Sequence, residues 1–160
     1  RYPARRGFED IVQIVADPDR DVAWTAVSFP KHRYVWFALK DPHVLNSTIM
    51  WMSNGGRHYP PWNGRHVNVM GLEEVTSYFH IGLAASAKKN PMNDKGVATV
   101  LQMKPARPTV VNYIMAVAGT PANFTGVKQI VLDSKGCTLV AESGKSVKVP
   151  LDTAFLRSGA

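Results

Sequence analysis

The sequence has little cysteine: Cys137 is the only one among its 160 residues. A single cysteine excludes an internal disulfide and any metal site built from several thiolates. It follows the turn at Lys135-Gly136 and begins a predicted strand, so we interpret it as a small buried hydrophobe. The low cysteine content is typical of cytosolic proteins, and we expect a cytoplasmic location.

The sequence also lacks long apolar runs and clustered basic residues. No apolar stretch approaches the roughly 20 residues that a membrane-spanning helix needs, and we recognise no signal peptide in the printed residues. The formal net charge is +7, but the basic residues are scattered along the chain. We therefore expect no membrane partner and no nucleic-acid partner, and we assign most of the charge to a solvated surface.

The composition is that of a folded globular protein, with 45% hydrophobic and 19% charged residues. A chain of this length can form one domain with a real core, so residues 1–160 are treated as a single domain. The first residue is Arg1 and not Met. This leaves open a processed product or a fragment of a longer protein.

Period-two alternation of apolar and polar residues predicts about nine strands separated by turn signals. The predicted strands are residues 21–29, 34–39, 47–52, 66–72, 97–103, 109–118, 127–132, 138–141 and 146–149. Residues 132–137 predict a hairpin. Short strands at regular spacing are typical of an antiparallel sandwich, so the predicted fold class is all-β.

Helix signals are weak. Residues 76–89 predict one short helix, with Thr76 and Ser77 as candidate caps and Gly82 weakening it. Residues 152–156 predict at most another helical turn. The sequence thus predicts no more than one or two short helices.

The segment with the strongest functional signal is residues 51–66. It combines two Trp, one Tyr, two Arg, two His and two Asn with Gly and Pro turn signals. Aromatic faces stack on the apolar C–H faces of a pyranose, and amides and guanidinium groups bond its hydroxyls. The segment therefore predicts a sugar site. The candidate substrate-binding residues are Trp51, Asn54, Arg57, Trp62, Asn63, Arg65 and His66.

The candidate catalytic residues are Glu73, Glu74 and His58. Adjacent residues of a strand point to opposite faces, so only one of the two glutamates can share a face with the tryptophans. Both could instead be surface carboxylates at a strand end. His58 is a candidate proton donor because histidine changes charge near neutral pH. Its spacing of eight residues from His66, with turns between, does not fit a metal pair, and we expect no metal.

At these residues the chain resembles the C-terminal half of the galactose mutarotase-like (aldose 1-epimerase) superfamily, most of all an uncharacterised bacterial branch. The resemblance is carried by residues 51–77, with Asn-Gly-Gly-Arg-His-Tyr-Pro-Pro-Trp-Asn-Gly-Arg-His and the Gly-Leu-Glu-Glu-Val end. Residues 97–108, 111–117 and 147–152 fit the same pattern. The resemblance implies an antiparallel β-supersandwich, of which this chain would be the whole domain or a C-terminal portion.

The resemblance also implies an activity. Such proteins open and reclose hexose rings, or only bind sugars, without a cofactor. The family's general base falls on Glu73, whereas Glu74 stands where many members have Pro. The family's acid histidine and sugar-binding arginine have no counterpart here. The expected ligand is a sugar or sugar phosphate; the alternatives are a non-catalytic carbohydrate-binding module, or an interaction domain that forms a homodimer through an exposed sheet edge.

Overall fold

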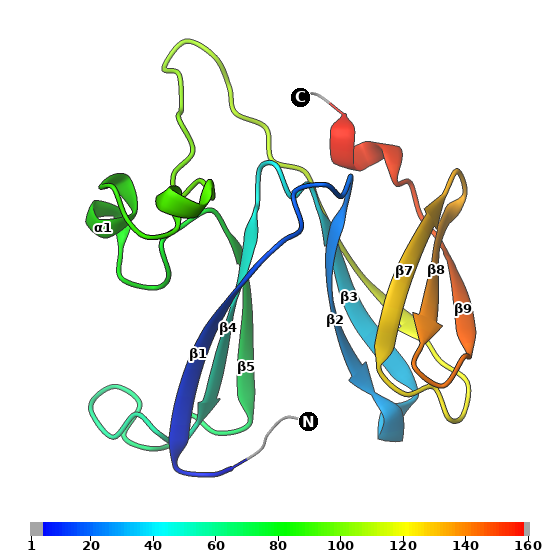
Figure 1. The fold of residues 1–160 in the computed structure, drawn as a ribbon. Helices are drawn as coiled ribbons and strands as arrows, with labels where there is room; N and C mark the ends of the chain where they lie inside the picture. Colours follow the sequence, from blue (N-terminus) through cyan, green and yellow to red (C-terminus); the bar gives the residue numbers. More distant parts are fainter. Residues whose placement is uncertain (1–4, 159–160) are drawn as a thin grey trace. The chain divides into compact units, whose positions relative to one another are not determined.

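A computed structural model describes residues 5–158 and shows an all-β protein with antiparallel sheets (Figure 1). The strands are β1 Phe8–Val15, β2 Ala23–Phe29, β3 Tyr34–Lys40, β4 Ser47–Asn54, β5 Val69–Val75, β6 Tyr113–Gly119, β7 Val127–Asp133, β8 Gly136–Ala141 and β9 Ser146–Pro150. The helical elements are α1 Leu83–Ala87 and the 3-10 turns η1 Pro30–His32, η2 Asn93–Lys95 and η3 Ala154–Arg157. The predicted all-β class is confirmed. Within the described residues, no helix has the length and apolar character needed to cross a membrane.

The chain forms two compact units. Unit 1 comprises Arg1–Pro18 and Pro42–Gln102, and unit 2 comprises Asp19–Asp41 and Met103–Ala160. Unit 1 contains one sheet with the strand order β1-β4-β5, in which the three strands lie side by side (Figure 1). Unit 2 contains two sheets, with the orders β2-β3-β6 and β7-β8-β9.

The two sheets of unit 2 share one hydrophobic core. Alternate residues of β3 face this core, and Phe37 and Leu39 are fully buried in it. The other buried members are Val35, Ala118, Phe124, Ile130, Cys137, Leu139, Ala141 and Leu156. Burial raises the pKa of the Cys137 thiol to about 11, with a smaller contribution from the charge of Asp133. The interpretation of this cysteine as a buried hydrophobe agrees with its place in the core.

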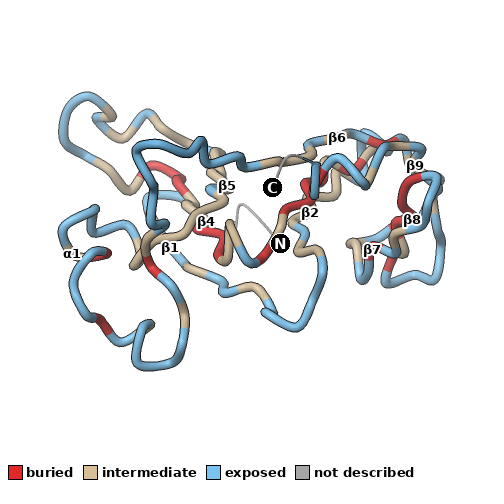
Figure 2. Tube along the Cα trace, turned by 90° about the horizontal axis from the view of Figure 1, so that it is seen from above, coloured by how far each residue is buried: buried red, intermediate tan, exposed pale blue. Residues whose placement is uncertain are grey.

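The sheet of unit 1 buries a different kind of residue. Its central strand β4 pairs with β1 on one side and with β5 on the other. Ile49 is its one buried hydrophobe among the described residues, whereas Ser47, Thr48, Ser53 and Asn54 are buried polar residues. Figure 2 shows buried positions along β4 in unit 1 and along β8 in unit 2.

One strand was missed, one predicted strand is wrong, and the strands predicted at 66–72 and 109–118 begin later, at Val69 and Tyr113. β1 is absent from the predicted strands because the neighbouring acids Glu9 and Asp10 and the apolar pair Ile11-Val12 break the alternation. The predicted strand at 97–103 is wrong, since these residues form no ladder. Thr99 is 2% exposed there, and its hydroxyl donates to the Ser86 carbonyl instead (2.7 Å).

The turns and helices follow the sequence more closely. β7 and β8 form the predicted hairpin, with Asp133 opposite Gly136. The Asp133 carboxylate accepts a hydrogen bond from the Lys135 amide (2.7 Å), as turn aspartates do. The caps predicted for the helix are wrong, because α1 begins after Gly82 without a side-chain cap and the Thr76 hydroxyl donates to the Val44 carbonyl.

Candidate functional site

The register of β4 and β5 decides which glutamate lies on the tryptophan face. Trp51 stands opposite Gly71, and Ile49 stands opposite Glu73. Because strand side chains alternate, Glu73 shares the face of Trp51 and Glu74 lies on the other face. Glu74 there accepts a hydrogen bond from the hydroxyl of its cross-strand partner Thr48 (2.6 Å). Of the two predicted carboxylates, Glu73 is therefore the one beside the aromatic residues.

The absence of a side chain at Gly71 leaves room for both the Glu73 carboxylate and the Trp51 indole. A Cβ atom at this position would lie 3.3 Å from Glu73 Oε1 and 3.6 Å from Trp51 Cε3. The carboxylate and the ring therefore both lie beside the bare backbone of Gly71. An alanine Cβ here would make ordinary contacts with Trp51 but would require the Glu73 carboxylate to move by a few tenths of an ångström, so glycine preserves the present place of that carboxylate.

Arg57 lies against both predicted tryptophans. Its Cζ atom is 4.6 Å from the ring centroid of Trp51 and 4.7 Å from that of Trp62. Its Nε donates to both carboxylate oxygens of Glu9, at 2.7 and 2.6 Å. This hydrogen bond is the main reason that the pKa of Arg57 is raised. The guanidinium is thus fixed by an ion pair and two cation–π contacts.

Two more rings extend this group into a continuous contact series, which we call the aromatic–arginine cluster: Tyr59, Trp62, Arg57, Trp51 and His66. Tyr59 meets Trp62 edge to face, with centroids 5.4 Å apart. His66 lies beside Trp51, with centroids 5.0 Å apart and planes inclined by 34°. The cluster therefore joins the face of the sheet to the loop between β4 and β5.

Backbone hydrogen bonds hold this loop in a defined shape. The Gly55 amide donates to the His66 carbonyl (2.8 Å), and the Gly64 amide donates to the Arg57 carbonyl (2.7 Å). Asn63 and Gly64 both have positive φ, at 47° and 70°. Both types tolerate that conformation better than other residues, which explains the Asn-Gly pair at the loop's tip.

The remaining predicted site residues lie outside the cluster. Asn54 is 6% exposed. Its Nδ2 donates to the Arg5 carbonyl (2.5 Å), and its Oδ1 accepts from the Asn68 backbone amide (3.0 Å), so it stabilises the fold. His58, Asn63 and Arg65 are exposed on the loop. The Arg65 guanidinium donates to the Pro61 carbonyl (3.3 Å). The structure therefore brings together Trp51, Arg57, Trp62, His66 and Glu73, and it leaves the other predictions on the loop or in the fold.

Several features of the site were not predicted from the sequence. Glu9 fixes Arg57 from 48 residues away, and no local pattern could signal that pairing. Ser53 binds the His66 ring, with Oγ 2.8 Å from Nδ1. The indole nitrogen of Trp51 is buried and has no hydrogen-bond partner among residues 5–158. In that same part of the chain, no three His, Cys, Asp or Glu side chains gather closely enough to hold a metal ion.

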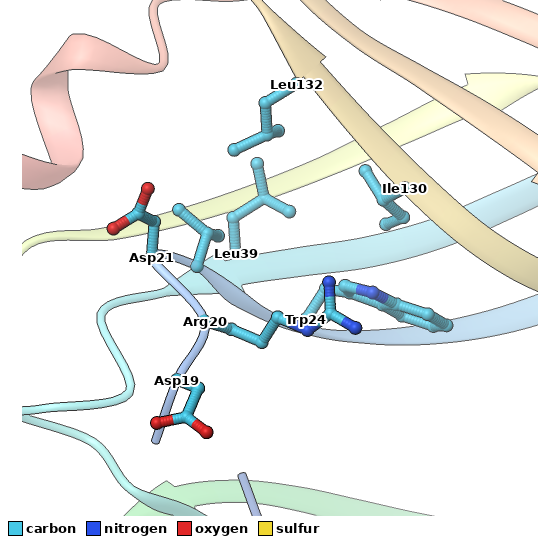
Figure 3. A pocket seen from close by; sticks show the side chains of 8 residues that line it. Asp19, Arg20, Asp21, Trp24, Leu39, Ile130 and Leu132 are labelled. Carbon is cyan, nitrogen blue, oxygen red and sulfur yellow. The ribbon is translucent and has the colours of Figure 1, made fainter. Parts of the chain in front are cut away.

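Unit 2 has a hollow of about 290 Å³ with a different set of lining residues. Figure 3 shows its apolar wall, formed by Leu39, Ile130 and Leu132, with the carboxylates of Asp19 and Asp21 pointing away from that wall. Asp21 forms an ion pair with Arg157 (3.1 Å). Neither the predicted catalytic residues nor the predicted sugar-binding residues line this hollow.

Comparison of the chain with protein-family models, with curated proteins and with solved structures finds no match. A functional assignment therefore depends on the chemistry of the aromatic–arginine cluster and of Glu73. The resemblance of residues 51–77 to the mutarotase-like superfamily adds to that chemistry as a hypothesis.

Proposed function

We propose that this protein binds a carbohydrate on the Trp51 face of the β1-β4-β5 sheet and interconverts its anomers as an aldose 1-epimerase-like enzyme. The observation that carries the proposal is the placement of Glu73. Its carboxylate lies beside the backbone of Gly71, the strand partner of Trp51, on the face that also presents the aromatic–arginine cluster. A carboxylate beside an aromatic surface is what proton removal from a sugar hydroxyl needs.

Arg57 supplies the hydrogen-bond donors for such a ligand. Its Nε is engaged by Glu9, whereas its two terminal nitrogens have no partner among residues 5–158. A guanidinium presents its donors in a planar fork, and here the contacts with Trp51 and Trp62 fix that plane in advance. A donor group that is already ordered loses less conformational entropy when the ligand binds.

The proposed reaction starts at the anomeric hydroxyl. Glu73 takes the proton from the C1 hydroxyl, and the bond between C1 and the ring oxygen breaks. Its electron pair moves to the ring oxygen, which takes a proton from water, and the open-chain carbonyl forms. The C1–C2 bond then rotates, and the ring closes on the other face of the carbonyl. Positioned proton transfer of this kind typically contributes about 10²–10⁴-fold to the rate, and it needs no cofactor.

A non-catalytic carbohydrate-binding module is the alternative. The exposure of Glu73 favours it, because a carboxylate in contact with water gains less from a preorganised environment than an enclosed one. In that case the same residues hold the sugar, and the rate of anomer interconversion does not change.

The test is polarimetric mutarotation of freshly dissolved α-glucose and α-galactose. We expect the wild-type chain to accelerate the change in rotation, and Glu73→Gln to lose that acceleration while sugar still quenches tryptophan fluorescence. Glu74→Gln is the matched control, since its carboxylate lies on the opposite face of the sheet. Full activity of Glu73→Gln would refute the base assignment. Sugar binding without any acceleration by the wild type would establish the binding module.

A further inference from the structure

The hollow of unit 2 reaches the hydrophobic core. Its apolar wall is formed by Leu39 of β3 and by Ile130 and Leu132 of β7 (Figure 3). Leu39 and Ile130 are buried members of the core, so the space beside them is lined by hydrocarbon. With about 290 Å³, the hollow lies close to the lower end of the roughly 300–1,000 Å³ that ligand pockets occupy. It therefore has room for a ligand of the size of an amino acid.

Trp24 adds an accessible indole to this wall. It is 37% exposed and lies on β2, an edge strand of the sheet with the order β2-β3-β6. Val22 precedes it and also lines the hollow. An aliphatic wall beside an accessible indole offers apolar area to a branched or aromatic hydrocarbon group, and burial of such a group is favourable. A sugar, which carries a hydroxyl on almost every carbon, gains little from this wall.

The other lining residues carry charges of both signs. Asp19, Arg20 and Asp21 precede β2, and Figure 3 shows the two carboxylates pointing away from the apolar wall. Asp21 pairs with Arg157, whose Nη2 lies 3.1 Å from a carboxylate oxygen and also donates to the Asp21 carbonyl (3.3 Å). The formal charges of these four residues sum to zero. The rim therefore favours neither a simple cation nor a simple anion, but a molecule that carries both charges.

We propose that the hollow of unit 2 binds a free amino acid with an apolar side chain, at a site that does not depend on the proposed carbohydrate function. The side chain of the ligand packs against the apolar wall, and its zwitterionic end stays at the charged rim. Arg20 binds the ligand carboxylate; a guanidinium has five N–H donors, so it serves this group in addition to a partner in the protein. Asp19 and Asp21 attract the ammonium group.

Each part of such a ligand has a separate physical role. Glycine has both charges but no side chain, so it leaves the apolar wall in contact with water and loses the gain from apolar burial. An amino acid capped at both ends has the side chain but neither charge, so it loses the charge-assisted hydrogen bonds to the rim. Because the rim lies in contact with water, with the Asp21 side chain 89% exposed, we expect a modest affinity.

The experiment is a fluorescence titration of the full chain carrying Trp51→Phe and Trp62→Phe, so that Trp24 and Trp36 give the signal. The probes are L-phenylalanine and L-leucine, with glycine and N-acetyl-L-phenylalaninamide as matched controls. We expect at least one probe to bind with a Kd of about 0.1–1 mM, which suits a ligand of about ten non-hydrogen atoms. Both controls should bind at least about 10-fold more weakly.

Two pairs of variants test the placement of the ligand. Val22→Phe adds a ring inside the hollow and should abolish binding, whereas Val131→Phe changes an exposed residue outside the lining and should not. Arg20→Gln removes the guanidinium and should weaken binding by about 10-fold or more. Arg33→Gln, at the exposed turn between β2 and β3, should match the wild type. If Val22→Phe does not fold, the arginine pair tests the site.

The outcomes decide between the ligands. Saturable binding that is lost in Val22→Phe and weakened in Arg20→Gln supports the inference. Equal binding of N-acetyl-L-phenylalaninamide overturns the zwitterionic ligand, because the hollow then selects only an apolar side chain, such as one of a peptide. No binding of either probe up to about 10 mM, or binding retained by a folded Val22→Phe, overturns the site. None of these results depends on mutarotation, so the proposed carbohydrate function is tested separately.

Discussion

The two units differ in what they bury. In unit 2 the buried side chains are hydrophobic, apart from Lys40, and they form one core between two sheets. In unit 1 the described buried side chains are polar, apart from Ile49 and Pro42, and they include Ser53, Asn90 and Thr99. Burial of apolar area is the main source of stability, whereas a buried polar group helps only when all its hydrogen bonds are made.

This difference in buried residues suits the two units to different roles. The core of unit 2 needs apolar side chains of the right size and shape, and it fixes no polar group in space. The hydrogen-bond networks of unit 1 fix the orientation of side chains. Asn54 joins the segment before β1 to the loop between β4 and β5. Ser53 contacts the His66 ring, and Glu9 holds the Arg57 guanidinium. Unit 1 is therefore the part of the molecule in which a site with oriented groups can be built.

The largest expected effect on stability is in the core of unit 2. Phe37 is fully buried, and Phe37→Ala removes a whole ring, so it should lower the free energy of unfolding by about 3–5 kcal/mol. Denaturant unfolding should be followed in a background in which Trp51 and Trp62 are replaced by Phe, so that Trp24 and Trp36 report on unit 2.

Met115→Ala is the control for this variant. Met115 lies on β6 in the same sheet, but its side chain points away from the core and is 65% exposed. It should change stability by less than about 0.5 kcal/mol. Equal losses in the two variants would mean that the packed core does not carry the stability of unit 2.

A smaller effect is expected for Thr99→Val in unit 1. The Thr99 hydroxyl donates to the Ser86 carbonyl (2.7 Å) and accepts from the amides of Asn90 and Asn93 (3.0 and 3.1 Å). Valine leaves these buried groups without a partner, at a cost of about 1–3 kcal/mol. Unfolding should be measured with Trp24 and Trp36 replaced by Phe, because the remaining tryptophans then report on unit 1.

Thr99→Ser sharpens this test. It keeps the hydroxyl and removes only a methyl group, so most of the stability should remain. If serine costs as much as valine, packing of the methyl group, and not the hydrogen-bond network, holds residues 83–99 together. The buried polar network would then contribute less to the stability of unit 1 than its hydrogen bonds suggest.

The sequence was sufficient for the elements whose signal is local. The hairpin at 132–137 is marked by Asp133 and Gly136, and alternation marks the strands of unit 2. β1 escaped prediction because both of its faces mix apolar and acidic residues. The strand predicted at 97–103 failed because the bonds of Thr99 run to residues 86–93, and a pattern of alternation does not show where hydrogen bonds go.

The candidate site shows the same difference between features with a local sequence signal and features set by long-range contacts. Glu73 and the tryptophans were selected as candidates because their residue types suit sugar chemistry. The choice between Glu73 and Glu74 needed the pairing of Trp51 with Gly71, which only the register of β4 and β5 supplies. Asn54 has the same residue type as a sugar ligand, yet its amide bonds two loops. Side-chain partners at long sequence separation decide such roles, and they are not visible in local sequence.

The smallest expected effect concerns binding. Arg57→Lys keeps the positive charge but loses the planar group that lies against Trp51 and Trp62 and donates through Nε to Glu9. Because an ammonium does not replace that geometry, sugar affinity should fall by about 5–10-fold, equivalent to about 1 kcal/mol. Fluorescence titration with the sugar that the wild type binds best measures this loss.

Arg65→Lys is the matched control, since Arg65 is exposed and makes a single bond to the Pro61 carbonyl. It should leave affinity unchanged. Because both variants keep the positive charge, a like loss in both would show that the ligand needs guanidinium donors at the exposed position as well, and that the fixed plane of Arg57 gives it no special part in recognition. A loss confined to Arg57→Lys, with the stability of unit 2 unaltered, would place recognition in the oriented side chains of unit 1.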